Sequence, residues 1–152
     1  ICTTHPYGYH DNIARTKASG LELEATQTLS DQWTIKGNYT FLTTRNEAAA
    51  FKGKRLPRTP GQMGSIDLAY AASAKLSLSL SVRYVGNSFD NASNTRRLSD
   101  YTLADLRAAY ALTPRVELYG RIENLTDTHY ETAAGYGQTG RRVWLGVHTR
   151  LF

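Results

Sequence analysis

Apolar and polar residues alternate along most of this chain with a period of two. In the clearest segment five apolar residues alternate with four polar ones: Leu76, Leu78, Leu80, Val82 and Tyr84 with Ser77, Ser79, Ser81 and Arg83. Strict alternation predicts a β-strand with one apolar and one polar face. We predict seven such strands, at residues 21–29, 35–41, 66–70, 76–84, 104–112, 116–123 and 143–152. The fold class is therefore all-β.

The connections between the predicted strands are alternately short and long. Residues 30–32, 71–75 and 113–115 are short links, whereas residues 45–61, 87–100 and 126–140 are long and polar. Outer-membrane barrels have short periplasmic turns and longer extracellular loops. The pattern predicts a transmembrane antiparallel β-barrel with its C-terminus on the periplasmic side.

Composition fits a barrel better than a helical membrane protein. Hydrophobic residues make up 41% of the chain, and its mean hydropathy is -0.44. No apolar run approaches the ~20 residues that a membrane helix needs. Ten tyrosines against four phenylalanines suit the interface between lipid and water. The polar face carries a dense ionic set that suits a water-filled interior: Glu22, Glu24, Lys36, Asp105, Arg107, Arg121 and Glu123.

Two other architectures share this pattern. A soluble β-sandwich or lipocalin-like barrel also alternates, although it would place its charges on the outside. A small self-contained outer-membrane barrel needs at least eight strands, and residues 2–13 could supply the eighth. The chain begins at Ile1 without an initiator Met or a signal peptide, so we expect either a removed leader or a piece of a longer polypeptide.

The sequence offers little for catalysis. It has no Gly-rich phosphate loop, no metal-ligand spacing and no nucleophile beside a base, and its one cysteine, Cys2, excludes an internal disulfide. We expect no enzyme activity, cofactor or metal. The four histidines are expected to be loop and strand residues: His5, His10, His129 and His148. Asp105 and Glu123 could suggest acid-base chemistry, but Arg107 and Arg121 in adjacent rows favour an ionic brace of the barrel wall.

The net charge of +5 has a local source in the first long connection. Lys52, Lys54, Arg55 and Arg58 fall within seven residues. Such a run is either a solvated loop or a contact for the phosphates of lipopolysaccharide, which arginine binds with bidentate geometry. Nucleic-acid binding is not expected, because no aromatic stacking platform accompanies the charge.

Several motifs resemble one family across nearly the whole chain. They are Tyr9 to Glu22, Arg55 to Pro60, Ile122 to Thr132, Gly135 to Arg141 and the terminal strand. Together they resemble the C-terminal end of a TonB-dependent outer-membrane receptor. Residues 130–141, with 94–97 and 101–106, are most similar to the cobalamin-receptor branch, and siderophore and haem receptors are the alternative.

The resemblance implies a 22-stranded barrel with a plug domain inside it. Residues 1–152 would then be the C-terminal part of the barrel domain, without the plug and the segment that contacts TonB. The implied function is import of a scarce nutrient, such as cobalamin, across the outer membrane of a Gram-negative bacterium. The implied partners are the rest of the barrel, the plug, TonB, outer-membrane lipid and lipopolysaccharide, the barrel-assembly machinery and the nutrient. The brace residues Asp105, Arg107, Arg121 and Glu123 would face the lumen or the plug.

The end of the chain departs from the family pattern. In the family, apolar or aromatic residues two and four positions before the final Phe share its phase, and the assembly machinery recognises this terminus. Here Arg150 and His148 stand at those positions before Phe152, and residues 147, 149 and 151 carry the apolar phase. We expect either a β-bulge that restores the face or weaker recognition.

Overall fold

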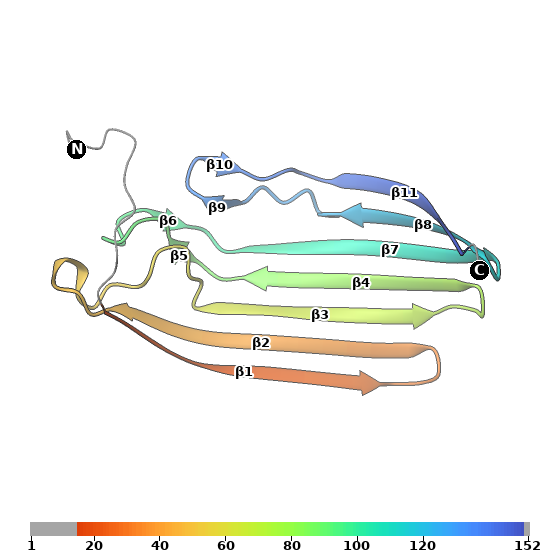
Figure 1. Ribbon diagram of the computed structural model, residues 1–152, viewed down its shortest axis with the longest axis horizontal. Helices are drawn as coiled ribbons and strands as arrows, with labels where there is room; N and C mark the ends of the chain where they lie inside the picture. The colour runs from red at the N-terminus through yellow and green to blue at the C-terminus, as the bar shows by residue number, and fades with distance from the viewer. Residues whose placement is uncertain (1–14, 151–152) are drawn as a thin grey trace.

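The computed structural model describes residues 15–150 and contains one large antiparallel sheet (Figure 1). Its seven long strands lie in chain order: β1 Thr16–Thr28, β2 Trp33–Asn46, β3 Gln62–Ala71, β4 Leu76–Val85, β7 Tyr101–Thr113, β8 Val116–Glu123 and β11 Arg142–Thr149. The predicted all-β class and the seven strands are confirmed. Within the described residues the sheet is open, with β1 and β11 as its edges.

The first two strands are longer than the alternation predicted. β1 pairs with β2 from Thr16 opposite Asn46 to Thr28 opposite Thr34 without interruption. The apolar pattern ends at Leu21 and Phe41, but the backbone ladder needs no apolar side chain and continues beyond both. The sheet therefore extends past its apolar band at this end.

Each of the three short turns is held by one hydroxyl group. The Ser30 Oγ accepts hydrogen bonds from the backbone N–H groups two and three residues later, at 3.2 Å each. The Ser73 Oγ and the Thr113 Oγ1 accept the corresponding pairs. These hydroxyl groups accept hydrogen bonds from the backbone that follows and so stabilise the turns.

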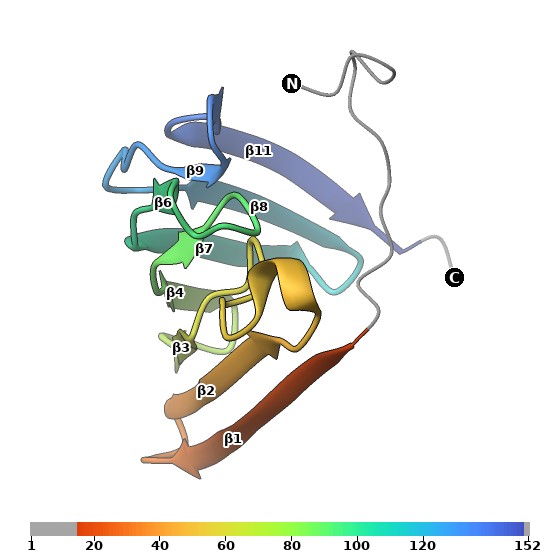
Figure 2. The same cartoon turned by 90° about the vertical axis from the view of Figure 1, so that its left-hand side faces the viewer.

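The three long connections lie at the opposite end of the sheet and contain short elements of their own (Figure 1). These are the 3₁₀ helix η1 Ala49–Phe51 and the strand pairs β5 Ser88–Phe89 with β6 Arg97–Leu98 and β9 Glu131–Ala133 with β10 Tyr136–Gly137. Figure 2 shows the sheet as a curve, with the first two connections lying over its concave side. The Leu56 N–H donates to the Thr44 Oγ1 at 3.1 Å. Since Thr44 shares the phase of Lys36 and Asn38, the concave side is the polar face.

The sheet has almost no hydrophobic core. Among residues 15–150, the only buried apolar side chains are Leu98, Leu103 and Ala109. By contrast, Leu145 on the apolar face is 85% exposed. A soluble β-sandwich would bury that face against a second sheet, so the described part of the chain does not fit that alternative. Residues 2–13, the possible eighth strand of a small barrel, lie outside the described residues.

The last strand keeps a constant register. β11 pairs with β8 from Arg142 opposite Glu123 to Thr149 opposite Val116 without a register shift. The bulge expected near the end is therefore absent from residues 142–149. Val147 lies opposite Leu118 on the apolar face, and His148 lies opposite Glu117 on the polar face. Phe152 lies outside the described residues.

Candidate functional site

The apolar face continues across all seven strands. Cross-strand register aligns Ile66 with Val82, Leu80 with Leu106, and Leu118 with Val147. Large apolar residues from both edges of this face are more than half exposed, including Leu21, Leu23, Val143 and Val147. An exposed apolar face of this extent requires an apolar surrounding.

Aromatic residues border this face at both ends. Near the short turns Trp33 stacks on Tyr70, with ring centroids 4.1 Å apart. Near the long connections the rings of Tyr39 and Phe41 lie 4.6 Å apart, and Tyr39 lies over Gly64 of β3. Aromatic residues that flank an apolar band are typical of transmembrane barrels, where they lie at the two lipid interfaces.

The ionic residues line the opposite face. Lys36 of β2 pairs with Glu24 of β1 at 2.8 Å. Glu123 of β8 collects three donors: Arg121 at 2.8 Å, Arg142 of β11 at 3.0 Å and the Trp144 Nε1 at 3.2 Å. The wall formed by β8 and β11 is therefore tied together by one carboxylate.

The four brace residues do not form a single ionic network. Register places Arg107 directly opposite Arg121, so like charges face each other across β7 and β8. Arg107 instead lies over the Tyr119 ring, 5.6 Å from its centroid, and Asp105 accepts the Asn124 backbone N–H at 2.8 Å. Only Arg121 and Glu123 form an ion pair among the four. The register of β7 and β8, which cannot be read from the sequence alone, decides these contacts, and the role of the four residues as a brace stays a prediction.

The first two long connections are locked together by Asn94. Its side chain accepts the Arg55 backbone N–H at 2.7 Å and donates to the Arg55 carbonyl at 3.0 Å. The Arg55 guanidinium donates to the Asn87 carbonyl at 3.1 Å and lies over the Phe89 ring. Asn94 has a positive φ of 58°, which asparagine adopts more readily than most residues. These contacts hold the two loops as one unit.

All three long connections meet at Asp90. The Arg58 Nε lies 2.8 Å from the Asp90 Oδ1. This hydrogen bond, together with one from the Ala134 backbone N–H in the third connection, lowers the pKa of Asp90 below its ordinary value. Sequence reasoning did not single out Asp90 and used Asn94 only as part of the family-like stretch 94–97, although the run of turn-forming residues from Asp90 to Asn94 was a signal for a structured loop.

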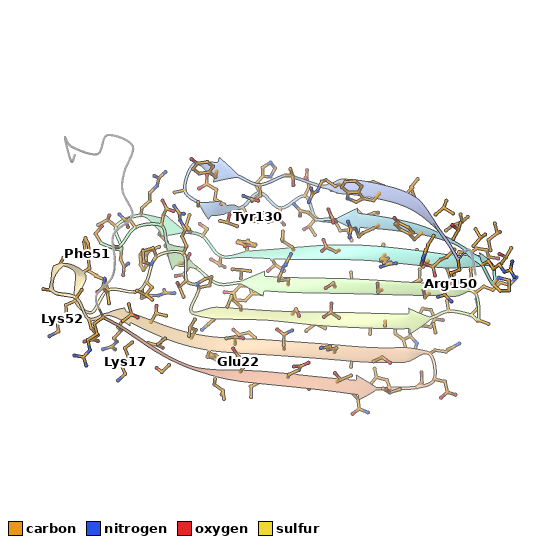
Figure 3. All side chains as sticks on the ribbon, viewed as in Figure 1. Lys17, Glu22, Phe51, Lys52, Tyr130 and Arg150 are labelled. Atoms are coloured by element: carbon orange, nitrogen blue, oxygen red, sulfur yellow. The ribbon has the colours of Figure 1, made fainter. Side chains whose placement is uncertain are left out.

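The basic run of the first connection is divided by this packing. Arg55 and Arg58 are engaged with the second connection, although Arg58 remains exposed. Lys52 and Lys54 are exposed as well. Figure 3 shows Lys52 at the outer tip beside η1. Two of the four cations are therefore already engaged by partners within the loops.

The third connection is built on the motif from Ile122 to Asp127. The Asn124 side chain bonds the Thr128 N–H and carbonyl, both at 2.9 Å, and the Asp127 Oδ1 accepts the Arg141 N–H at 2.7 Å. Asn124 and Asp127 both have positive φ, at 50° and 55°. The family-like residues thus shape the return of the chain into β11.

No cluster of three or more metal-ligating residues occurs within residues 15–150. His129 and His148 lie in the third connection and in β11, whereas His5 and His10 are outside the described residues. In the described part of the chain, no helix has the length and apolar character to span a membrane.

The sequence from Cys2 to Leu125 matches the family model described as TonB dependent receptor-like, beta-barrel. The chain belongs to this family. Among curated proteins it is 26% identical to a probable TonB-dependent siderophore receptor, PiuA, of Acinetobacter baumannii over 81% of this chain and 18% of that protein. It is 31% identical to the ferrioxamine B receptor of Salmonella typhimurium over 86% of this chain and 20% of that protein. The Vitamin B12 transporter BtuB of Photobacterium profundum is 34% identical over 60% of this chain and 15% of that protein.

Solved structures show the same fold. The siderophore receptor PiuA from Acinetobacter baumannii aligns with a TM-score of 0.80 at 24% identity, over 88% of this chain and 22% of that one. The ferric yersiniabactin uptake receptor FyuA from Yersinia pestis aligns with a TM-score of 0.81 at 22% identity, over 90% and 24%. The sheet is thus the counterpart of roughly a quarter or less of these receptors.

Proposed function

We propose that residues 1–152 form the C-terminal part of the barrel of an outer-membrane receptor that imports a scarce nutrient with energy from TonB. The observation that carries this proposal is a family-matched sheet with one apolar face and one ionic face. In this arrangement the apolar face contacts lipid and the ionic face lines the lumen. The plug domain and the segment that contacts TonB belong to the rest of the polypeptide, in keeping with the small share of each relative that this chain spans.

The brace residues contribute to the lumen wall. Glu123 ties β8 to β11 through Arg121 and Arg142, and Arg107 remains available to a carboxylate of the plug. The interlocked connections over the concave side form a fixed part of the external vestibule. Their preformed contacts reduce the ordering cost of binding a nutrient there.

For the substrate we propose an iron chelate of the siderophore class. This assignment is supported by the siderophore-related relatives that match over most of the chain. Cobalamin is the second candidate, because the cobalamin transporter of Photobacterium profundum has the higher identity over a shorter stretch.

Uptake by cells that express the full-length protein tests both assignments. Cells with and without the gene are given radiolabelled ferric siderophores or radiolabelled cobalamin, in strains with and without TonB. We expect gene-dependent iron uptake that disappears without TonB. Gene-dependent uptake of cobalamin alone would overturn the siderophore assignment, and uptake that persists without TonB would overturn the proposed energy source.

A further inference from the structure

Two cations lie opposite each other at the edge of the apolar face. Lys17 of β1 pairs in register with Arg45 of β2, in the same phase as the apolar pair Leu21 and Phe41. Both side chains are exposed. They share the end of the sheet that carries the long connections, and Figure 3 shows Lys17 at the same end as Lys52.

The position of Lys17 and Arg45 along the membrane normal places them at the level of the lipid headgroups. Four residues separate Arg45 from Phe41, or about 13 Å along a strand at ~3.3 Å per residue. With a tilt of about 45° this becomes roughly 9 Å along the membrane normal. The headgroup region adds about 5–7 Å to each side of the hydrocarbon core, and Lys and Arg side chains can extend several ångströms along a surface. Both charges can therefore reach the headgroups while remaining on the outer face.

The described residues provide no counter-charge between these cations. None of the ion pairs formed within residues 15–150 includes Lys17 or Arg45. Glu47 follows two residues after Arg45, beyond the end of β2, and its backbone N–H bonds the carbonyl of Arg15, which is itself a cationic residue. Like charges directly opposite each other in a sheet are unfavourable. An anion bound between Lys17 and Arg45 would remove this repulsion.

We propose that Lys17 and Arg45 form a site for the phosphate of an outer-leaflet lipid, with lipopolysaccharide as the occupant. The proposal rests on the proposed function, because it requires an outer-membrane barrel. Arg45 supplies the planar fork that matches a phosphate, and Lys17 supplies a point charge. Lys52 and Lys54 add exposed charge farther from the lipid. Arg55 and Arg58 take no part, since both are bound to the second connection.

The test compares matched charge removals in the full-length protein. The first variant carries Lys17→Gln and Arg45→Gln. The control carries Lys75→Gln and Arg115→Gln, which remove the same charge from exposed residues of the short turns at the other end. The measurement is lipopolysaccharide retained per protein after purification in mild detergent. Its affinity is then measured by titration with phosphorylated lipid A, dephosphorylated lipid A or inorganic phosphate.

We expect the affinity for phosphorylated lipid A to fall about 30-fold in the first variant, because each cation near an anionic lipid contributes about fivefold. The affinity of the control should stay unchanged. Dephosphorylated lipid A should bind the wild-type protein and the first variant equally. Inorganic phosphate should not compete with phosphorylated lipid A. A combined Lys17→Arg and Arg45→Lys variant should keep most of the affinity. Equal retention in the two charge-removal variants would overturn this site alone, and competition by inorganic phosphate would assign it to a free anion. Absence of the wild-type protein from the outer-membrane fraction would overturn the proposed function as well.

Discussion

Replacing Leu80 with Arg tests which face contacts lipid. Leu80 lies in the middle of β4, between Leu68 of β3 and Leu106 of β7. It is four residues from both Leu76 and Tyr84, which mark the ends of the apolar row on this strand. The position is therefore close to the middle of the apolar band. An arginine at the bilayer midplane costs about 2–4 kcal/mol, and we expect that loss of unfolding free energy.

Ser79 provides the matched control on the polar face. It lies between Ala69 of β3 and Arg107 of β7, so Ser79→Arg adds a like charge opposite Arg107. That cross-strand repulsion costs up to about 1 kcal/mol. Ser79→Glu should instead pair with Arg107 and cost nothing measurable. Urea unfolding of the full-length protein in lipid vesicles, followed by heat-modifiable mobility, measures the difference. Equal losses for Leu80→Arg and Ser79→Arg would refute the assignment of the faces.

Four further predictions concern the packing of the sheet, the loops and the open edges. Gly146→Val should lower the free energy of unfolding by about 1–3 kcal/mol, because a Cβ atom at position 146 would overlap the Tyr119 ring. Urea unfolding measures this loss, and the additional change Tyr119→Ala should restore part of the stability. Asn94→Ala should cost about 1–3 kcal/mol through lost hydrogen bonds, and hydrogen exchange should show faster exchange at the Arg55 N–H. Because the pKa of Asp90 is lowered in the folded protein, its contact with Arg58 stabilises the loops fully above about pH 4, and this stabilisation is lost as the pH falls further. Proteolysis of the loops should therefore increase only in that acid range in the wild-type protein. In the Asp90→Asn variant it should be increased at any pH. The isolated chain should aggregate or remain open, since both edges are unpaired, and a monodisperse heat-modifiable monomer on gel filtration would contradict this.

The strands and turns could be predicted from local pattern. Alternation identified every long strand because each of them separates an apolar from a polar environment. The three short turns also carry a local signal, the Ser or Thr at positions 30, 73 and 113, whose hydroxyl bonds the following backbone. The start of β1 and the end of β2 could not be predicted. Lys17 and Arg45 lie beyond the apolar band, where the alternation stops but the backbone hydrogen bonds between the two strands continue.

The candidate site needed information that no single segment contains. Whether Arg107 meets a carboxylate or Arg121 depends on the register of β7 and β8, and a shift of one residue would reverse the faces. In the same way, the basic run around Arg55 looked uniform in the sequence. The second connection, nearly 40 residues away, engages Arg55 and Arg58 and leaves the two lysines exposed. Long-range packing therefore decided which charges are available.

The two faces and the two edges of the sheet both require further strands beside it. Leu21 and Leu145, on the edge strands β1 and β11, are 56% and 85% exposed, and each of these strands pairs on one side only within the described residues. Lipid can cover the apolar side chains, but it cannot satisfy the backbone N–H and carbonyl groups of an open edge. Only further strands can do so, and they would also enclose the ionic face around Glu123 and Arg107. A closed barrel with strands beyond those described is therefore the arrangement in which every surface of this sheet has a suitable neighbour.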